Sequence, residues 1–407
     1  MGSFVVNGGN PLSGRVVVSG AKNSALPILF STISAKGISK IHNVPDIGDV
    51  KIALDILRGF GAEVKIDADT VIVDTRELHY YEPPETLTAS LRASTYLIGA
   101  TLARFGRANI GLYGGCNFAP RPIDLHIYAM EQMGAKRIGN TLVLAKHRDS
   151  HIMFTKTSVG ATVNSLILAS SIEKTTVIDG CAIEPHILVL VEYLRKSGTE
   201  IIIENRRITV KGKGQTGATI TLNGDMIEAA TYHILSVLLG GDIVVDGIDM
   251  DELSIFTDTL TNAGVVQQKL DTGVRFCGKM STTVDIIASP YPGFATDLCP
   301  LCVPLLASFF GGSVRDLVFP TRFGYLFDLA YFGLSFIRLE GGVYILPSRI
   351  HPATVHAPDL RGGMAALILA LLAKGESTIR SAETILRGYS SLTQKLSSLG
   401  AKIDFFR

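Results

Sequence analysis

The feature that most constrains the fold is a glycine that recurs six times at nearly regular spacing. Each copy follows the end of a helical pattern and precedes a β-prone run. Successive copies are 73, 64, 66, 69 and 67 residues apart. They are Gly61, Gly134, Gly198, Gly264, Gly333 and Gly400. Glycine is favoured just after a helix because it enters the left-handed backbone region without a Cβ clash. We therefore predict six copies of one structural unit.

A second pattern alternates with the first, in which small and apolar residues fill a helix that leads into a strand. These stretches are Ser24–His42, Ser94–Leu112, Val163–Ile178, Ala229–Val245, Cys302–Leu317 and Met364–Ile379. A helix that is apolar nearly all round is expected to be buried. Each unit would thus combine one buried helix, one surface helix and short strands, and six units would divide into two domains of three. The alternative is an open α/β sheet in which the glycine spacing is coincidental.

Length, charge and cysteine content are compatible with two domains and disfavour several classes of partner. The 407 residues exceed the usual size of one domain. The 38 Lys and Arg nearly balance the 37 Asp and Glu, which gives no bulk attraction to nucleic acid or to an acidic membrane. We recognise no apolar run of membrane-spanning length and no secretory signal. Five cysteines favour free thiols in a reducing cytoplasm over a disulfide framework.

Several helix starts carry residues suited to anions. Lys22 and Asn23 follow a Ser-Gly turn at the start of the first apolar helix, and Arg92 stands at the start of the second apolar helix. Backbone N–H groups and a cation converge at such a start. Residues 156–160 begin a further apolar helix in a manner that suits a diphosphate. The alternative for Lys22 is a solvated side chain at a hinge between domains.

Cys116 stands in a segment that is typical of a loop. Two glycines precede it, and Pro-Arg-Pro follows. The glycines permit close approach, and Arg121 would lower the pKa of the thiol, so Cys116 is a candidate acid, base or nucleophile. The alternative is an inert buried cysteine, which the flanking glycines and prolines disfavour.

The second half of the chain carries scattered charges that suit carboxylate and phosphate recognition. Asp297 follows Thr296 just before an apolar helix, where its alternative role is helix capping. Arg322, Arg361 and Arg387 are candidate ligands, because arginine recognises carboxylates and phosphates in a bidentate manner. Taken singly, each is a surface charge.

Two motifs resemble known functional sites but are not interpreted as such. Cys299 and Cys302 have the spacing of metal ligands, but no second pair accompanies them, so we expect two core thiols. The glycine-rich stretches lack the pattern of a nucleoside-triphosphate-binding loop.

Taken in order, these motifs resemble the enolpyruvyl transferase family over essentially the whole chain. The matching segments are Ser19-Gly20-Ala21-Lys22-Asn23, Gly114-Gly115-Cys116, Arg121-Pro122-Ile123-Asp124-Leu125-His126 and Ser158-Val159-Gly160-Ala161-Thr162. The cysteine loop and residues 121–126 separate the chain from relatives that act on shikimate 3-phosphate. The resemblance implies an α/β fold of two inside-out barrel domains, each with three repeated units around buried helices, and an active site in the interdomain cleft. It implies a first domain at 22–223, which carries the cysteine loop, and a second at 1–21 and 224–407.

The resemblance also implies a reaction. The enolpyruvyl group of phosphoenolpyruvate would pass to the sugar 3-hydroxyl of UDP-N-acetylglucosamine with release of phosphate, as the first committed step of peptidoglycan synthesis. The implied catalytic residues are Cys116, Asp297, Lys22, Asp359 and Arg387. Asp297 would take the proton from the sugar hydroxyl, and Asp359 would assist proton handling. Cys116 would transfer a proton at C3 of phosphoenolpyruvate, form a covalent adduct and be the thiol alkylated by fosfomycin.

Two overlapping ligand sets follow from the same resemblance. The implied phosphoenolpyruvate ligands are Lys22, Asn23, Arg92, Arg121, Arg322, Arg361 and Arg387. The implied nucleotide-sugar ligands are Asn23, Arg92, Arg121, Pro122, Ile123, Asp124, Leu125, Lys156, Ser158, Val159, Gly160, Thr296, Asp297 and Val318. The clustered cations would offset the repulsion between two anionic substrates. We expect no cofactor, metal, nucleic acid or membrane partner, and a monomer or weak oligomer in the cytoplasm.

The identity of the acceptor is the open question at this point. The chain departs from the family pattern at Tyr96, Met226, Pro320, Thr384 and Leu386, and several of these positions lie near the acceptor or the closing cleft. One alternative is a paralogue that acts on another uridine nucleotide, such as UMP. Another is a non-catalytic nucleotide sensor, which the complete catalytic set disfavours. A third is an RNA 3′-phosphate cyclase-like enzyme, which the near-neutral charge disfavours.

Overall fold

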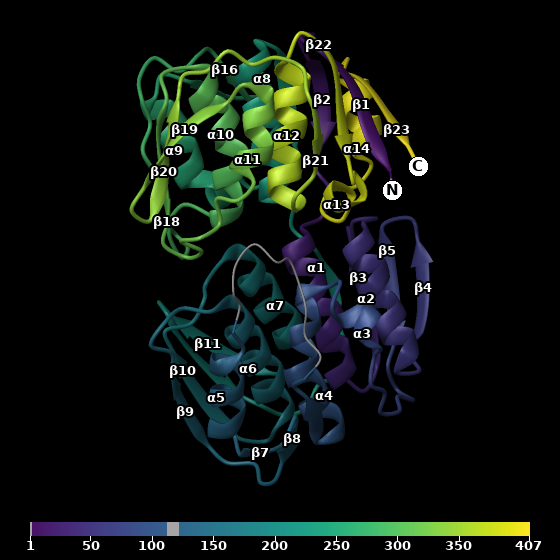
Figure 1. Ribbon diagram of the computed structural model, residues 1–407. Helices are drawn as coiled ribbons and strands as arrows, with labels where there is room; N and C mark the ends of the chain where they lie inside the picture. The colour runs from purple at the N-terminus through teal and green to yellow at the C-terminus, as the bar shows by residue number, and fades with distance from the viewer. Residues whose placement is uncertain (1, 112–121) are drawn as a thin grey trace. The chain divides into compact units, whose positions relative to one another are not determined.

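The chain forms a mixed α/β structure in two compact units (Figure 1), seen in a computed structural model that describes residues 2–111 and 122–407. The terminal unit comprises residues 1–19 and 224–407, and the central unit comprises residues 20–223. Each unit has its own hydrophobic core. The central unit begins at Gly20, two residues before the predicted boundary at Lys22. A Cβ at Gly20 would meet the carbonyl oxygen of Asn43, so this residue packs within the central unit.

Six apolar helices are each followed along the chain by a strand, as predicted from the repeat. The pairs are α1 (Lys22–Ser31) with β3 (Ile38–His42), α4 (Leu97–Phe105) with β6 (Arg107–Asn109), α6 (Val159–Ser171) with β10 (Thr175–Asp179), α8 (Met226–Leu239) with β14 (Asp242–Asp246), α10 (Cys299–Ser308) with β18 (Gly312–Asp316), and α12 (Leu360–Leu372) with β22 (Gly375–Arg380). Most residues of each of these helices are buried. A helix can be buried on all sides because its backbone hydrogen bonds are satisfied internally.

Six helical segments end at the recurring glycines and lead into strands. They are α2 (Gly48–Gly59) before β4 (Glu63–Asp67), α5 (Asp124–Gln132) before β7 (Ala135–Ile138), α7 (Pro185–Lys196) before β11 (Glu200–Glu204), α9 (Ser254–Asn262) before β15 (Val266–Lys269), α11 (Leu326–Leu329) with the 3₁₀ helix η5 (Ala330–Phe332) before β19 (Ser335–Leu339), and α14 (Leu392–Ser398) before β23 (Lys402–Phe406). All six glycines have φ between 89° and 110°. This conformation strains residues that carry a Cβ, which explains the recurrence of glycine. The predicted six-unit organisation is confirmed.

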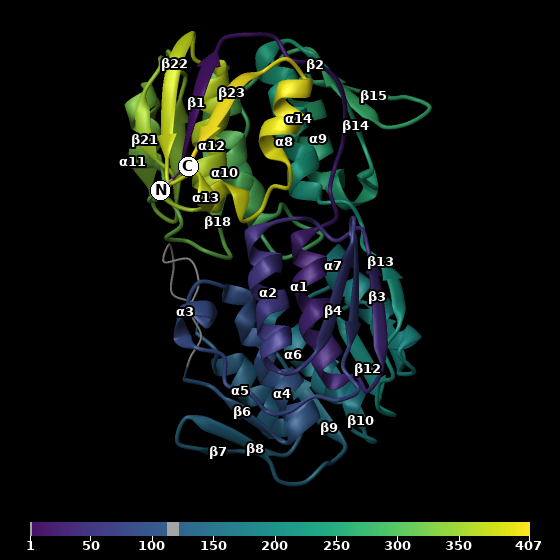
Figure 2. The same cartoon turned by 90° about the vertical axis from the view of Figure 1, so that its right-hand side faces the viewer.

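Three sheets enclose the helices in the described part of the terminal unit. Their orders are β21-β22-β1-β23, β15-β16-β14-β2 and β17-β18-β20-β19. The strands not yet introduced are β1 (Ser3–Gly8), β2 (Ser13–Val17), β16 (Val274–Cys277), β17 (Ile286–Ala288), β20 (Gly342–Leu346) and β21 (Thr354–His356). Figure 2 shows β1 beside β22 and β23, with which it pairs in antiparallel register. Since β2 also pairs with β14, the first residues of the chain complete sheets built by its second half.

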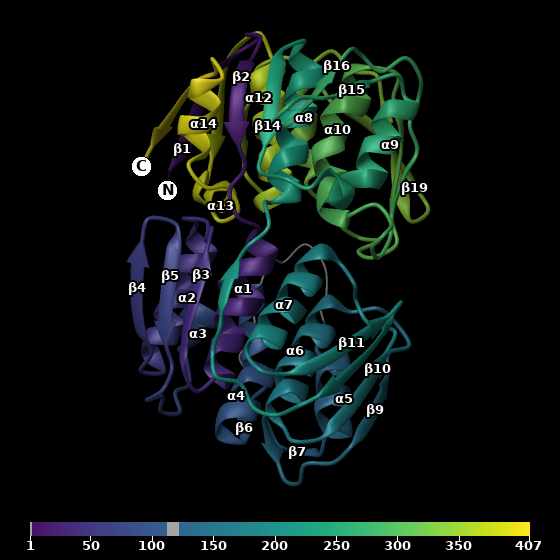
Figure 3. The same cartoon turned by 180° about the vertical axis from the view of Figure 1, so that it is seen from behind.

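Three sheets also wall the described part of the central unit. Their orders are β13-β3-β5-β4, β11-β12-β10-β9 and β6-β8-β7. The remaining strands are β5 (Thr70–Asp74), β8 (Thr141–Leu144), β9 (Ser150–Met153), β12 (Arg207–Lys211) and β13 (Thr219–Thr221). Figure 3 shows α6 and α7 beside the sheet that contains β9, β10 and β11. This unit is closed by β13, which pairs in parallel with β3 near its start.

In each unit the apolar helices pack together inside the sheets. In the terminal unit α8, α10 and α12 contact one another, and in the central unit α4 contacts both α1 and α6 (Figure 1). Helices in the centre and sheets outside are the arrangement expected of an inside-out barrel. No helix within residues 2–111 and 122–407 combines the length and the apolar character needed to cross a membrane.

Candidate functional site

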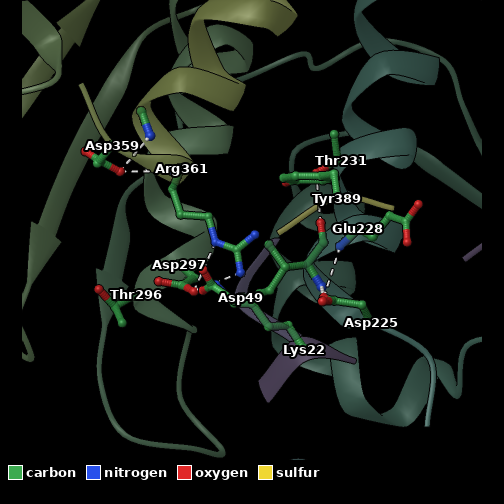
Figure 4. A network of polar contacts seen from close by, with 12 residues as sticks. Lys22, Asp49, Asp225, Glu228, Thr231, Thr296, Asp297, Asp359, Arg361 and Tyr389 are labelled. Carbon is green, nitrogen blue, oxygen red and sulfur yellow. Dashed lines mark hydrogen bonds and ion pairs between the residues drawn. The ribbon is translucent and has the colours of Figure 1, made fainter. Parts of the chain in front are cut away.

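Asp297 is the centre of a charged cluster in the terminal unit. It lies in the 3₁₀ helix η4 (Thr296–Leu298), which leads into α10. Arg322 Nη1 donates to Asp297 Oδ1 at 2.8 Å. Arg361 Nε donates to Asp297 Oδ2 at 3.0 Å (Figure 4). The two arginine side chains are 4% and 3% exposed, whereas that of Asp297 is 28% exposed. Two buried cations therefore hold a carboxylate that still reaches solvent.

The Asp297 carboxylate stabilises the charged form of both arginines. Burial alone would lower the pKa of the Arg361 guanidinium, but the nearby Asp297 carboxylate more than offsets this, and the pKa is raised. The pKa of Arg322 is raised by the same balance of burial and the Asp297 charge. Both arginines are thus charged, and two adjacent cations favour the ionised form of the carboxylate.

Asp359 fixes the start of the helix that carries Arg361. It is the N-cap of α12, and its Oδ1 accepts hydrogen bonds from the backbone N–H groups of Arg361 at 2.9 Å and Gly362 at 3.1 Å. A Cβ at Gly362 would lie 2.5 Å from Cβ of Tyr325, so a larger residue would push this turn away. Capping satisfies helix-end N–H groups that lack a partner within the helix. The role of Asp359 in proton handling stays a prediction.

Asp316 is a functional candidate that the sequence reasoning missed. It ends β18 and is buried, and its Oδ1 accepts hydrogen bonds from the backbone N–H groups of Val318 at 2.9 Å and Phe319 at 2.8 Å. The hydroxyl of Thr296 donates to its Oδ2. Asp316 therefore orders both Thr296 and Val318, two predicted contacts of the nucleotide sugar. An Asp at the end of a strand, followed by a turn, was the available signal.

Arg387 caps the short helix α13 (Glu383–Leu386), which contacts α12, and it is half-buried. The next residue, Gly388, packs on Leu360 so closely that a Cβ would lie 2.5 Å from its Cδ1. Because Leu360 directly precedes Arg361, this contact brings Arg387 toward the start of α12. The predicted site residues of the second half are thus distributed around η4, the end of β18 and the start of α12.

Lys22 begins α1 in the central unit, and its role in binding an anion stays a prediction. Its Nζ lies 3.3 Å from Asp49 Oδ2, and Asp49 sits in the first turn of α2. The Lys22 side chain is 15% exposed. Asn23 follows and is half-buried. Asp49 was not predicted, although an acidic residue in a first helical turn is favoured by the helix dipole.

Three further segments of the central unit that carry predicted ligands begin at helix starts. Arg92 begins the 3₁₀ helix η2 (Arg92–Tyr96), Asp124 begins α5, and Val159 begins α6. Ser158 caps α6 by accepting a hydrogen bond from the backbone N–H of Ala161 at 3.3 Å. The helix α6 contacts both η2 and α5.

The other described residues of the nucleotide set that belong to the central unit are exposed or half-buried. Pro122 and Lys156 are exposed, and Leu125 is half-buried. Ile123 and Asp124 line an open hollow of about 470 Å³ over α5. Cys116 and Arg121 lie outside the described residues.

The two cysteines interpreted as core thiols are buried in α10. Burial raises the pKa of both the Cys299 and the Cys302 thiol, which disfavours the thiolate form that binds metals. Within the described ranges, no group of three or more His, Cys, Asp or Glu side chains is placed to hold a metal ion.

The terminal unit holds a carboxylate between two buried arginines, and the central unit carries lysine and arginine side chains at helix starts. The chain belongs to the EPSP synthase (3-phosphoshikimate 1-carboxyvinyltransferase) family, which it matches over residues 6–396. The predicted membership of the enolpyruvyl transferases is thereby confirmed.

Curated relatives match over almost their entire length. A protein of Streptococcus mutans named UDP-N-acetylglucosamine 1-carboxyvinyltransferase 2 is 38% identical over 99% of both chains. One of Caldanaerobacter subterraneus, named UDP-N-acetylglucosamine 1-carboxyvinyltransferase 3, is 37% identical over 99% of both chains.

Solved structures share the fold. The enolpyruvyl transferase NikO from Streptomyces tendae matches with a TM-score of 0.87 and 23% identity, over 99% of this chain and 98% of that one. EPSP synthase from Acinetobacter baumannii matches over both full chains with a TM-score of 0.72 and 16% identity. The predicted fold class is confirmed.

Proposed function

We propose that this protein transfers the enolpyruvyl group of phosphoenolpyruvate to the sugar 3-hydroxyl of UDP-N-acetylglucosamine. The observation that carries the proposal is the full-length similarity to relatives named UDP-N-acetylglucosamine 1-carboxyvinyltransferase. The reaction releases phosphate and would supply the first committed precursor of peptidoglycan. It would take place in the cytoplasm and be carried out by a monomer or weak oligomer.

Asp297 is proposed to accept the proton of the attacking hydroxyl. Its partial exposure leaves the carboxylate within reach of a substrate, and the arginines at 2.8 and 3.0 Å hold it in one orientation. A positioned general base typically accelerates a reaction by about 10²- to 10⁴-fold. The two guanidinium groups leave the exposed part of the carboxylate open to a substrate hydroxyl that is aimed at it.

The bond changes of the proposed reaction balance as follows. The sugar oxygen forms a bond to C2 of phosphoenolpyruvate while its proton passes to Asp297, and C3 gains a proton from Cys116. A proton then returns from C3 to the Cys116 thiolate, which restores the double bond as the C2–O bond to phosphate breaks, and the proton held by Asp297 leaves with the phosphate. Lys22, Arg121 and Arg387 would hold the phosphate and carboxylate of phosphoenolpyruvate, and Asp359 would assist proton handling at the tetrahedral intermediate. Neutralising these charges at the reacting centre is the main electrostatic task of such a site.

The nucleotide would be bound at the helix starts of the central unit. Ser158, Val159 and Gly160 begin α6, whose backbone N–H groups suit a diphosphate. Residues 121–125 would contact the uridine. In the terminal unit, Thr296 and Val318 are ordered by Asp316 and would contact the sugar.

Phosphate release from phosphoenolpyruvate tests this function when UDP-N-acetylglucosamine and UMP are offered separately as acceptors. We expect release and a product heavier by one enolpyruvyl group only with UDP-N-acetylglucosamine. Release with UMP alone would instead establish a paralogue that acts on another nucleotide. A folded protein that releases phosphate with neither acceptor would point to a nucleotide-sensing role. D297N should lose most of the activity, whereas D285N, which changes an exposed aspartate of the same unit, should retain it.

A further inference from the structure

Asn164 joins three helical segments of the central unit from a fully buried position in α6. Its Oδ1 accepts a hydrogen bond from the backbone N–H of Gly99 at 2.6 Å. Its Nδ2 donates to the carbonyl oxygen of Thr95 at 3.0 Å, lies 3.4 Å from the carbonyl oxygen of Gly160, and lies 2.7 Å from Nδ1 of His126. Gly99 is in the first turn of α4, Thr95 is in η2 and His126 is in α5. One amide therefore connects the segments that begin at Arg92 and Asp124 to α6.

These contacts fix the tautomer of His126. The oxygen of Asn164 must face Gly99, because an N–H group cannot accept a hydrogen bond. The nitrogen must face Thr95, because a carbonyl oxygen cannot donate one. The amide nitrogen cannot accept a hydrogen bond, so Nδ1 of His126, 2.7 Å away, must be unprotonated, and a neutral ring then carries its proton on Nε2.

The proton-bearing edge of the His126 ring lies against the first turn of α6. A Cβ added at Gly160 would be 2.7 Å from Cε1 and 2.8 Å from Nε2 of this ring. A Cβ added at Gly99 would likewise be 2.8 Å from Oδ1 of Asn164. Both glycines are therefore needed for close packing rather than for an unusual backbone angle.

The surroundings keep the ring uncharged. Burial and then the charge of Arg92 lower the pKa of His126 to about 4, and Asp124 opposes this shift. The ring is only 3% exposed. At neutral pH the first turn of α6 is thus lined by an uncharged N–H group.

We propose that Asn164 and His126 are positioning residues for the nucleotide diphosphate, which act by fixing a neutral Nε2–H imidazole against Gly160. This inference rests on the proposed function, since the ligand is a uridine nucleotide. An N–H edge beside a phosphate-binding turn adds partial positive charge, whereas the other tautomer would turn a lone pair toward the phosphates. An amide at position 164 is required because a carboxylate would draw the ring proton to Nδ1 and add a buried negative charge.

The test compares N164D with Q215E. Gln215 is also buried, and its amide contacts the far end of α6 at Ile167 and Ser171, so Q215E is a matched amide-to-acid control. UDP affinity is measured by calorimetry without phosphoenolpyruvate. The tautomer is read from the ¹⁵N shifts of a histidine-labelled protein, with H126F identifying one resonance among nine histidines. Thermal melting confirms that each variant is folded.

We expect wild-type His126 to be neutral with its proton on Nε2 at pH 7. N164D should move the proton to Nδ1 and weaken UDP binding by about tenfold or more, because the ring would then turn the lone pair of Nε2 toward the diphosphate. The UDP affinity of Q215E should lie within about twofold of the wild-type value, because Gln215 lies away from the helix starts. This difference is well below a tenfold change, which corresponds to about 1.4 kcal/mol. H126F, whose ring lacks both nitrogens and therefore the Nε2–H group, should weaken UDP binding even if N164D does not fold.

Three results would overturn the inference: a proton on Nδ1 in the wild-type protein, equal UDP affinity in N164D and wild type, or equal affinity in H126F and wild type. Failure of the proposed function is seen separately. A wild-type protein that binds UDP but transfers no enolpyruvyl group would overturn the reaction and leave the positioning role standing. A wild-type protein that does not bind UDP would overturn both.

Discussion

Replacing Asp297 with Asn should reveal a structural role of this residue alongside its proposed catalytic one. The substitution removes the charge that faces Arg322 and Arg361, whose side chains are 4% and 3% exposed. Breaking a fully buried ion pair by removing one partner costs about 3–5 kcal/mol. Asp297 is 28% exposed and Asn keeps one acceptor oxygen, so we expect the lower figure of about 2–3 kcal/mol. The two arginines would then also repel each other in a buried setting.

The expected loss can be measured as a melting temperature. The terminal unit has 203 residues, from 19 in residues 1–19 and 184 in residues 224–407. For a unit of this size each kcal/mol shifts the melting temperature by about 2–4 °C, so D297N should melt about 4–12 °C below wild type. Added salt should restore little of this, because buried charges are poorly screened. D285N serves as the control. If D297N had the same melting temperature as D285N, the account of the Asp297 cluster would be refuted.

The other predictions concern the terminal unit and the cysteine loop. Lys395 Nζ lies 2.6 Å from the buried carboxylate of Glu228, whose pKa is raised by burial against the opposing effect of this lysine. Because the folded state holds the Glu228 proton more tightly than the unfolded state does, the stability it confers is present below the unfolded pKa and lost as pH rises through the folded pKa. K395M should therefore lower the melting temperature more at pH 8 than at pH 5, and a loss independent of pH would contradict this. D316N should weaken UDP-N-acetylglucosamine binding by about tenfold, because the hydrogen bonds that order Thr296 are disturbed; calorimetry with an unchanged affinity would show that Asp316 does not order the sugar site. C116S should resist irreversible inactivation by fosfomycin, and continued inactivation would exclude Cys116 as its target.

Much of the fold could be predicted because its signals are local. The positive φ of Gly61, and of its five counterparts, is required by the backbone at one residue. The buried character of a helix such as α12 follows from the composition of a single stretch. The glycine and the buried helix recur in each structural unit, so six individually weak signals together predicted the repeat.

The contacts of the site could not be predicted, because they join residues far apart in the chain. Asp49 meets Lys22 from the start of another helix, and Asp316 meets Thr296 from the end of a strand. Sequence alone also left open whether Asp297 caps a helix. The N-cap of α10 is Leu298, and the Asp297 carboxylate contacts arginines instead.

The arginines themselves illustrate a further limit of the sequence. Arg322 and Arg361 were predicted to bind phosphoenolpyruvate, and the structure shows both of them buried against Asp297. An arginine in the sequence does not reveal whether it binds a carboxylate of the substrate or one of the protein, because the same bidentate geometry suits both. Their contact with phosphoenolpyruvate stays a prediction.

The most direct test of the central claim follows a carbon label from phosphoenolpyruvate into the product. Phosphoenolpyruvate labelled with ¹³C at C2 is incubated with UDP-N-acetylglucosamine, and the product is examined by NMR while free phosphate is measured. The account predicts an enol ether in which the labelled carbon is coupled to the proton at sugar C3, together with one phosphate per product. A label that stays in phosphoenolpyruvate, or that appears on another hydroxyl or only on UMP, would contradict it.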